Sequence, residues 1–340
     1  KTKDVIWNKA LPVINGAFSP DGGPKANYTT NLNMCETSNK GFELALNTRN
    51  IITKNFTWSS SVTFNHNKEK ITKLSGGDSD VLNNGDTGYA LALGEAINSY
   101  YHYKLDGVWQ KGEETDAAVF GAAPGDLKIN IPNLVKESDG RFYKIDEETG
   151  SAAVDENGNV IYYTSDNKYT PSDADYQILG HNSPDWSLGF QNNFTWKDFD
   201  LSVFVYARYG QMFAYDMLTS YDPKGIRNFP TYFNYWTENN PSNDFPAANA
   251  NKGLEQYTGY YALRYVDGSF IKIKNITLGY SLPKSILKSA GIEKCRFYAT
   301  ITNPFVFAKS HLLKDYDPEM NGSLKYPLTK QFVFGVNVTF

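Results

Sequence analysis

The amino-acid sequence predicts an all-β fold, a transmembrane antiparallel β-barrel with long extracellular loops and short periplasmic turns. The first observation is that segments of apolar–polar alternation recur along the chain, which is the pattern of strands with one buried face. The second is the aromatic share of 15% in 340 residues, because aromatic side chains favour strands and membrane interfaces. The third is that long and short connections alternate between these segments, as they do in outer-membrane barrels.

Seven segments carry the alternation, and each gathers apolar residues on one side. They span residues 42–49, 55–65, 186–196, 199–210, 270–283, 295–303 and 330–340. The segment 270–283 departs from the pattern, since Lys272 and Lys274 fall on the same side as Ile276, Leu278 and Tyr280. Either a bulge shifts its register or its first half lies above the apolar layer.

The last segment alternates up to its final residue. Its apolar positions are Phe332, Phe334, Val336, Val338 and Phe340. The intervening positions are Val333, Gly335, Asn337 and Thr339. We expect the first set to face lipid and the second to face the lumen.

The connections between the segments sort into two classes. Three are short, at residues 50–54, 197–198 and 283–294, and the third predicts one small helix, opened by Pro283 and ended by Gly291. Three are long, at roughly 67–185, 210–268 and 304–330. No other segment predicts a helix, and the first 40 residues are expected to form turns and loop without a clear strand.

Seven strands do not close a bacterial barrel, which has an even number of strands from about eight upward. We therefore expect residues 1–340 to be the C-terminal part of a longer barrel protein. Its earlier strands would lie outside this chain. The sequence shows no signal peptide, which agrees with that expectation.

Composition excludes several other classes of protein. No run of about 18 apolar residues predicts a transmembrane helix. The net charge of −4, with both signs interspersed, leaves no footprint for nucleic acid. The only cysteines, Cys35 and Cys295, are expected to be unrelated thiols. The histidines are too far apart to suggest a metal site, and they are His66, His102, His181 and His311.

Two kinds of motif could suggest chemistry but have simpler explanations. The carboxylates in Asp317–Glu319 and Asp146–Gly150 could be a glycosidase pair, yet acids within one loop are better explained as solvated side chains. The segments Asp155–Asn159 and Gly76–Asp80 resemble calcium loops but lack the final Glu of an EF-hand, which favours turns. We therefore expect no enzyme activity, no metal and no cofactor.

Several stretches of the chain match the motifs of one known protein family. The stretch "NKGFELALNTRNI" with "NFTWSSSVTFNHNKEKITKL" looks like the family's N-x-G-x-E strand pair. "YYHYKLDGVWQKGEE" and "AAPGDLKINIPN" resemble its central loop motifs, and "LGHNSPDWSLGFQNNFTWKDFDLSVFVYARYGQ" resembles its G-x-x-x-P hairpin. "LRYVDGSFIKIKNITLGYSLPKSIL" and "ITNPFVFAKSHLLKDYDPE" are similar to its last strands. With these motifs the chain resembles SusC/RagA-type TonB-dependent outer-membrane transporters, and the resemblance runs from about Asn39 to Phe340.

Three departures from the family pattern bear on local loop conformation. His102 stands where Gly is usual, Asn130 and Ile131 displace an aromatic-x-Asp, and Pro304 replaces Leu after Asn303.

The resemblance implies a large, 22-stranded barrel whose lumen is filled by an N-terminal plug domain absent from this chain. It implies import of an oligosaccharide or a peptide across the outer membrane of a Gram-negative bacterium. The implied partners are a SusD-like surface lipoprotein, TonB acting through the absent N-terminal region, and outer-membrane lipid with lipopolysaccharide. No catalytic residues are expected.

Aromatic residues in the external loops are the candidates for substrate binding, because Tyr and Trp offer an apolar face with a polar handle. They are Tyr101, Tyr103, Trp109, Tyr232, Tyr235 and Trp236. The alternative is that these rings pack the loops together or contact the lipoprotein. A second set is expected to face the lumen and contact the plug or water, namely Arg208, Tyr206, Arg296 and Tyr298.

The resemblance also gives the final strand a role in assembly. In the family, a terminal aromatic residue on such a strand is read by the outer-membrane assembly machinery. The resemblance therefore implies that Phe340 marks a genuine C-terminus. The residues that would carry this signal are Phe334, Val336, Val338 and Phe340.

Two other functions stay open at this point. A secreted glycan-binding β-protein would share the strands and the aromatic loops. A different type of outer-membrane barrel, such as an autotransporter translocator, would close within this chain. Substrate identity is beyond the sequence, since one scaffold can carry many cargoes.

Overall fold

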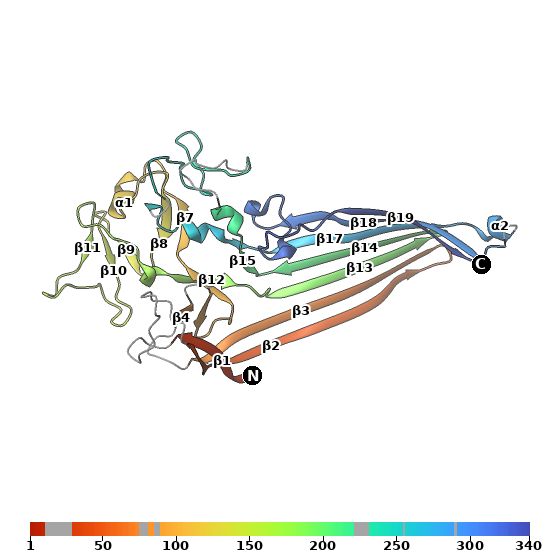
Figure 1. Ribbon diagram of the computed structural model, residues 1–340, viewed down its shortest axis with the longest axis horizontal. Coiled ribbons are helices and arrows are strands. Elements are labelled where there is room, and N and C mark those ends of the chain that lie inside the picture. Colours follow the sequence, from red (N-terminus) through yellow and green to blue (C-terminus); the bar gives the residue numbers. More distant parts are fainter. Residues whose placement is uncertain (11–28, 75–80, 85–88, 221–230, 254–255, 289–290) are drawn as a thin grey trace.

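A computed structural model describes the chain except for residues 11–28, 75–80, 85–88, 221–230, 254–255 and 289–290. Its main feature is one antiparallel sheet of eight long strands in the order β1-β2-β3-β13-β14-β17-β18-β19 (Figure 1). The strands are β1 (Thr2–Ala10), β2 (Thr29–Ile52), β3 (Phe56–Leu74), β13 (Trp186–Trp196), β14 (Phe199–Tyr209), β17 (Phe270–Ser281), β18 (Lys294–Ala308) and β19 (Gln331–Thr339). Each of these eight strands pairs with the next one of the eight in chain order, and the sheet does not close into a barrel within the described residues.

The register places the apolar positions of different strands in continuous rows. One row crosses six strands and consists of Leu46, Val62, Phe190, Val205, Ile273 and Phe305. Because side chains alternate between the faces of a strand, these residues all point to the same face. That face stays apolar and largely exposed, for example at Phe307 and Phe334. The prediction of a transmembrane antiparallel barrel wall is therefore confirmed.

One row of this apolar face is interrupted by polar side chains. Asn192 lies there, and its Oδ1 accepts hydrogen bonds from the Ser60 hydroxyl at 2.8 Å and from Trp58 Nε1 at 3.0 Å. The Asn50 amide in turn donates to Ser60 Oγ at 2.8 Å. Polar groups that face hydrocarbon need partners within the protein. The cluster supplies such partners to its own members.

A bulge in β17 settles the position of its lysines. Phe204 pairs with Asn275, whereas Val205 pairs with Ile273, so Lys274 is the extra residue between them. Lys272 then lies opposite Tyr206 on the inner face, and Ile273 joins the outer apolar rows. Of the two explanations that the sequence allowed, the shifted register is the right one.

The expectation of no strand in the first 40 residues is wrong. β1 pairs with the Thr29–Thr37 part of β2. Of the stretch expected to be turns and loop, residues 11–28 lie outside the described range. The register shifts near Val5, and Asp4 has a φ of 56°, which breaks the regular alternation in the sequence. The expectation of a single helix is also wrong. Besides α2 (Lys284–Leu287) there is α1 (Glu114–Val119) within the first long connection.

The long connections carry structure of their own at the end of the sheet opposite the short turns (Figure 1). The first contains α1, the 3₁₀ segment η2 (Asp173–Asp175) and the strands β4 (Val81–Asn84), β5 (Tyr89–Ala92), β6 (Ser99–His102), β7 (Lys104–Val108), β8 (Leu127–Asn130), β9 (Leu134–Lys136), β10 (Phe142–Lys144), β11 (Tyr162–Tyr163) and β12 (Gln177–His181). The second contains β15 (Met212–Ala214), β16 (Tyr265–Asp267), η3 (Asp216–Thr219) and η5 (Tyr260–Arg264). The third contains η7 (His311–Leu313) and η8 (Pro318–Met320).

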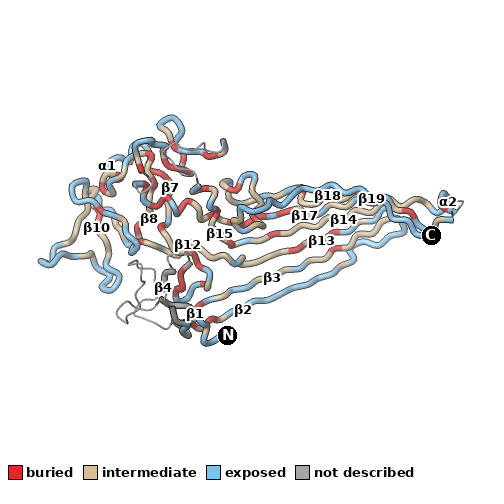
Figure 2. The backbone as a smooth tube through the Cα atoms, viewed as in Figure 1, coloured by how far each residue is buried: buried red, intermediate tan, exposed pale blue. Residues whose placement is uncertain are grey.

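These three connections pack around one hydrophobic core. Its buried members come from each connection, for example Val108, Phe213 and Leu313. Figure 2 shows that buried residues gather in this external part, whereas the sheet itself is mostly of intermediate or high exposure. The external loops therefore form one packed assembly.

No helix among the described residues is long and apolar enough to span a membrane. Cys35 and Cys295 are both buried free thiols.

Candidate functional site

The inner face of the sheet carries the four residues that were predicted to face a lumen. Arg208 donates from Nε to the Tyr206 hydroxyl at 2.8 Å and from Nη1 to Asn321 Oδ1 at 3.3 Å. Arg296 is bound by both oxygens of Asp200, at 2.9 and 2.6 Å. These contacts place the side chains on the face opposite the apolar rows. Their exposure to a lumen and a plug stays a prediction.

The inner face needs glycine at position 335, beside the Tyr298 side chain. A Cβ at Gly335 of β19 would collide with the Tyr298 ring, which lies over it. Glycine at this inner position therefore gives Tyr298 its space.

The β18–β19 loop folds back onto this inner face. Lys272 is fully buried, and its ammonium donates to Asp317 Oδ2 at 2.5 Å and to Glu319 Oε2 at 2.9 Å. Lys274 binds the other oxygen of Glu319 at 2.6 Å. Burial alone would raise the pKa of Glu319, but the hydrogen bonds from Lys274 and Lys272 hold it below its ordinary value. The loop is thereby fixed to β17 by an ion-pair cluster.

Most of the aromatic candidates lie inside the external loop assembly. Trp236 is buried in its core and donates from Nε1 to Gln110 Oε1 at 2.9 Å. Tyr232 packs against the same core. Tyr235 is the candidate with the most exposed side chain, at 41%. Tyr232 and Trp236 thus pack the loops together, which was the alternative explanation for these rings.

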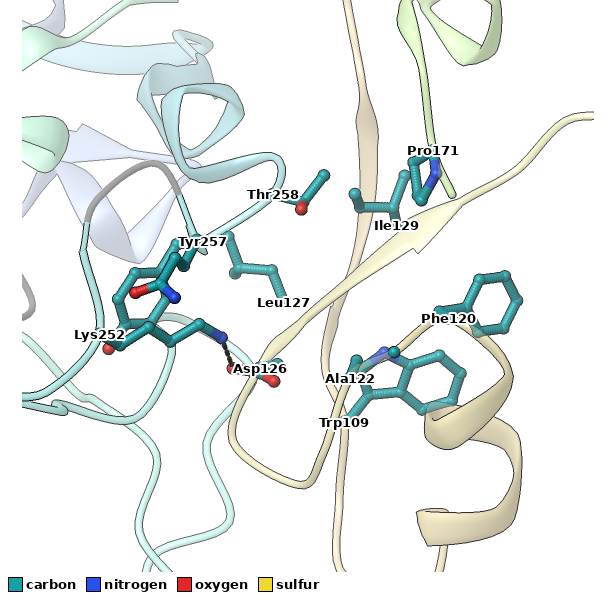
Figure 3. Close-up of a pocket in the computed structure, with 12 residues that line it drawn as sticks. Trp109, Phe120, Ala122, Asp126, Leu127, Ile129, Pro171, Lys252, Tyr257 and Thr258 are labelled. Atoms are coloured by element: carbon teal, nitrogen blue, oxygen red, sulfur yellow. Dashed lines mark hydrogen bonds and ion pairs between the residues drawn. The ribbon is translucent and has the colours of Figure 1, made fainter. Parts of the chain in front are cut away.

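Trp109 lines a small cavity between the first and second long connections (Figure 3). Trp109 and Phe120 lie on one side of it, and Lys252 and Tyr257 lie on the other. Lys252 pairs with Asp126 at 2.5 Å. The cavity measures about 60 Å³, which is room for one or two water molecules and not for a sugar ring or a peptide residue. We assign it to packing between the loops.

A larger cavity of about 430 Å³ lies where all three long connections meet, and we call it the Tyr103–Met212 cavity. Its walls come from β7, β12, β15, η5, the turn at Asn243 and Asp244, and η7. The lining residues are Tyr103, Lys104, Leu105, Gly107, Gln177, Ile178, Leu179, Met212, Asn243, Asp244, Ala262, Leu263, Tyr265 and Leu312. Volumes of about 300–1,000 Å³ with mostly apolar walls are typical of ligand sites.

Packed rings support one wall of this cavity. Tyr103 and Tyr176 meet edge to face with centroids 4.7 Å apart, and His102 stacks on Tyr176 at 4.8 Å. Tyr101 also packs edge to face on Tyr176. Burial lowers the pKa of His102 to about 4, and the positive charge of Arg264 acts in the same direction. His102 is therefore neutral at physiological pH.

Among the six aromatic candidates, Tyr103 alone lines the Tyr103–Met212 cavity. The sequence reasoning missed Tyr265, Leu179 and Met212, which come from other elements. Leu179 and Tyr265 belong to the quoted "LGH" and "RYVDG" stretches, but nothing in the sequence indicates that these two stretches meet in the fold. Their meeting depends on how the loops pack.

A third hollow of about 840 Å³ lies between the upper part of β18 and the β18–β19 loop. It runs along β18 above the point where β19 begins, since Gln331 pairs with Thr302.

Comparison with known proteins gives a consistent set of relatives, although no family model matches the chain. The chain is 28% identical over 362 residues to the TonB-dependent receptor P3 of Formosa agariphila, with all of this chain and 31% of the relative covered. It is 26% identical over 350 residues to the TonB-dependent receptor SusC of Bacteroides thetaiotaomicron, again over its whole length and over 29% of the relative. The chain thus spans about a third of the length of these relatives.

The solved structures agree on the fold. The RagAB peptide transporter aligns with a TM-score of 0.68 at 23% identity, covering 99% of this chain and 32% of that chain. The RagAB peptide importer in its open-open state aligns with a TM-score of 0.65 at 22% identity, covering 99% of this chain and 31% of that chain.

Proposed function

We propose that this chain, which is part of a SusC/RagA-type TonB-dependent receptor in the outer membrane of a Gram-negative bacterium, serves the active import of a large nutrient. The cargo would be an oligosaccharide or a peptide. The observation that carries the proposal is the construction of the sheet, with one apolar face, one polar face and large packed loops at one end. A wall of this kind separates lipid from an interior path.

The energy for import and the selection of cargo would come from partners and parts of the protein outside residues 1–340. We propose that a plug domain and further strands complete the barrel, and that TonB acts through that plug. A SusD-like surface lipoprotein would cover the external loop assembly, while outer-membrane lipid and lipopolysaccharide would surround the apolar face. The chain would act by binding and passage and not by covalent chemistry.

The relatives leave the cargo class open. SusC and the P3 receptor are TonB-dependent receptors, and RagAB is a peptide transporter. The outer-membrane location argues against a secreted glycan-binding protein. The relatives argue against a barrel that closes within this chain.

The final strand would also direct assembly. Phe334, Val336 and Val338 lie on the apolar face of β19, with Phe340 just beyond its end. We propose that this terminal aromatic run is recognised during insertion into the outer membrane.

The test uses the full-length protein. We expect it to purify from the outer membrane together with a surface lipoprotein. We expect deletion of its gene to abolish growth on one class of glycan or peptide as sole nutrient. Recovery without any lipoprotein, and unchanged growth on every such nutrient, would contradict the proposal. A matched strain that carries the gene on a plasmid is the control.

A further inference from the structure

We propose that the outer face of β2 and β3 holds a binding site for the phosphate groups of lipopolysaccharide in the outer leaflet of the membrane. Three residues form this site, Lys40, Lys68 and Lys70, and we call them the lysine patch. The inference goes beyond nutrient import and rests only on the location of the sheet in the outer membrane. It follows from the height of the patch, the crowding of its charges and the positions of the nearby acids.

The register places the lysine patch on the lipid-facing side of the sheet. Phe42 and His66 form the last pair of the outer apolar rows on these two strands. The next pair on the same face is Lys40 with Lys68, and Lys70 follows one step further along β3. The pairing is regular over this stretch, so side chains two residues apart stay on one face. The patch therefore continues the outer rows upward.

Two rows of rings mark the edges of the apolar layer below the patch. In the upper row, Trp186 pairs with His66 and stacks on Tyr209, with ring centroids 5.5 Å apart. In the lower row, Trp196 stacks on Phe199 at 6.3 Å. The 11 residues of β13 join the two rows. They span roughly 34 Å along the strand, or roughly 25 Å of depth at a tilt of about 40°, which is the height of the apolar band in outer-membrane barrels.

The lysine patch consequently lies at the depth of the lipid headgroups. Lys40 and Lys68 stand two residues beyond the upper row of rings, which is roughly 7 Å along the strands. The polar interface outside the hydrocarbon layer is about 5–8 Å thick on each side of a bilayer. The ammonium groups therefore meet the charged groups of the surrounding lipid.

The charges of the patch are crowded and unpaired. Lys40 lies directly opposite Lys68, and Lys70 is its diagonal neighbour. Like charges directly opposite each other destabilise a sheet. All three lysines are exposed, and among the residues that the structure describes their ammonium groups have neither an ion pair nor a hydrogen bond. By contrast, Lys309 above β18 pairs with Asp267 at 2.7 Å. A phosphate group between the lysines of the patch would relieve their repulsion.

The nearby carboxylates do not supply that negative charge. Glu43 and Glu69 alternate onto the inner face of the sheet, and so does Asp185 just before β13. Glu36 continues the outer face of β2, but Lys1 binds it at 2.7 Å. The counter-charge of the patch must therefore come from another molecule.

Charge and position together favour a phosphorylated lipid over a soluble anion or an acidic protein segment. Phe42 lies directly below the patch and is 58% exposed, so a ligand that covers both needs an apolar part beside its anionic group. A phosphorylated lipid lays its acyl chains along the apolar rows and brings its phosphates to the lysines. Lysines at such a surface strengthen the binding of anionic lipid.

The test measures the binding of fluorescent lipopolysaccharide to the full-length protein in an uncharged detergent. The probes are lipopolysaccharide with its phosphates and the same molecule after dephosphorylation. We expect the phosphorylated form to bind roughly 100-fold more tightly, at roughly fivefold for each lysine. Added salt should weaken its binding, because the lysines are exposed. Excess inorganic phosphate at constant ionic strength should not displace it.

Substitutions locate the binding. Replacing all three lysines of the patch by glutamine should weaken binding of the phosphorylated form roughly 100-fold and leave that of the dephosphorylated form unchanged. Lys68→Gln alone should weaken it roughly fivefold. The matched control combines Lys54→Gln, Lys284→Gln and Lys288→Gln, three exposed lysines at the opposite end of the sheet. It removes the same charge and should change neither affinity.

Several outcomes would overturn the inference. One is equal affinity for the two forms of lipopolysaccharide, and another is unchanged binding by the triple variant of the patch. Displacement by inorganic phosphate would make a free anion the ligand. Loss of the co-purifying lipoprotein from the triple variant, with lipopolysaccharide binding unchanged, would assign the patch to a protein partner. Each of these results leaves nutrient import standing, because the growth test described above decides that function separately.

Discussion

Lys272 is the residue on which the position of the β18–β19 loop depends most. Two sequence motifs, "FIKIKN" and "DPE", meet at its ammonium, although Lys272 and Asp317 stand 45 residues apart. β17 supplies the lysines, and η8 with its N-cap residue Asp317 supplies the carboxylates. Asp317 also accepts a hydrogen bond from the Glu319 backbone N–H at 3.1 Å, which shapes the turn. Asp317 and Glu319 are mostly buried and are held by the buried Lys272 and the partly exposed Lys274, so the expectation of solvated side chains is wrong for this loop.

Replacing Lys272 by methionine should release this loop. The change leaves two carboxylates facing each other without their buried cation, and removal of one partner of a buried ion pair typically costs roughly 3–5 kcal/mol. Lys274 still binds Glu319, so we expect about 3 kcal/mol. We predict faster protease cleavage within residues 310–330 in intact cells and a lower urea midpoint in liposomes.

Lys314→Met is the control, since Lys314 lies exposed in the same loop. Equal cleavage rates for Lys272→Met and the unaltered protein would show that the cluster does not hold the loop.

His102 ties the stability of the loop assembly to pH. Its pKa is about 4 in the folded protein, below the ordinary value of 6.5. The unfolded loop therefore binds more protons between these values, so the contribution of neutral His102 is complete above pH 6.5 and is lost as the pH falls toward 4. We expect a loss of about 1–2 kcal/mol, less than the full shift would give, because the ring is partly solvated.

Hydrogen exchange of residues 99–103 and 177–181 at pH 7 and pH 4.5 measures this effect. The unaltered protein should lose protection at the lower pH beyond the intrinsic change in exchange rate. His102→Phe keeps a ring on Tyr176 but takes up no proton, so it should lose less. The same loss in both proteins would mean that His102 is not the titrating group.

At the scale of the elements, the sequence predicts the seven long strands because each alternates within the membrane layer. It does not predict β1 or the upper part of β2. In β1 the apolar residues Val5, Ile6 and Trp7 follow one another without alternating and the register shifts near Val5, while the upper part of β2 is largely polar, as in Thr29–Asn33. The bulge in β17 was recognisable as a break in alternation. Which residue is the extra one could be seen only from the pairing of β17 with β14, because register is defined between two strands.

The external loops are less predictable than the sheet for a physical reason. α1 has only six residues and no side-chain cap, so it leaves no periodic signal in the sequence. The cavity walls come from all three long connections, which only the packed core brings together. Sequence reasoning could therefore name aromatic candidates, but it could not tell that Trp236 serves the core while Tyr103 lines a cavity.

At the scale of the whole molecule, the chain places its hydrophobic core outside the membrane layer. The buried residues gather mainly in the loop assembly (Figure 2). The register of the strands places the apolar side chains of the sheet on its exposed outer face. A water-soluble sheet protein would bury that face against a second layer. Lipid as the solvent of one face explains two features of the sheet: the apolar rows on its outer face, and the polar cluster at Asn192, whose members hydrogen-bond to one another.

The most direct test of this account is the environment of each residue along β19 in the full-length protein. Single nitroxide labels would be placed from residue 332 to residue 339, with Cys35 and Cys295 replaced by alanine, and the protein would be inserted into liposomes. We predict that lipid-soluble oxygen relaxes the labels strongly at Phe332, Phe334, Val336 and Val338 and weakly at the residues between them. Equal relaxation at all positions, or the opposite phase, would contradict the assignment of this face to lipid.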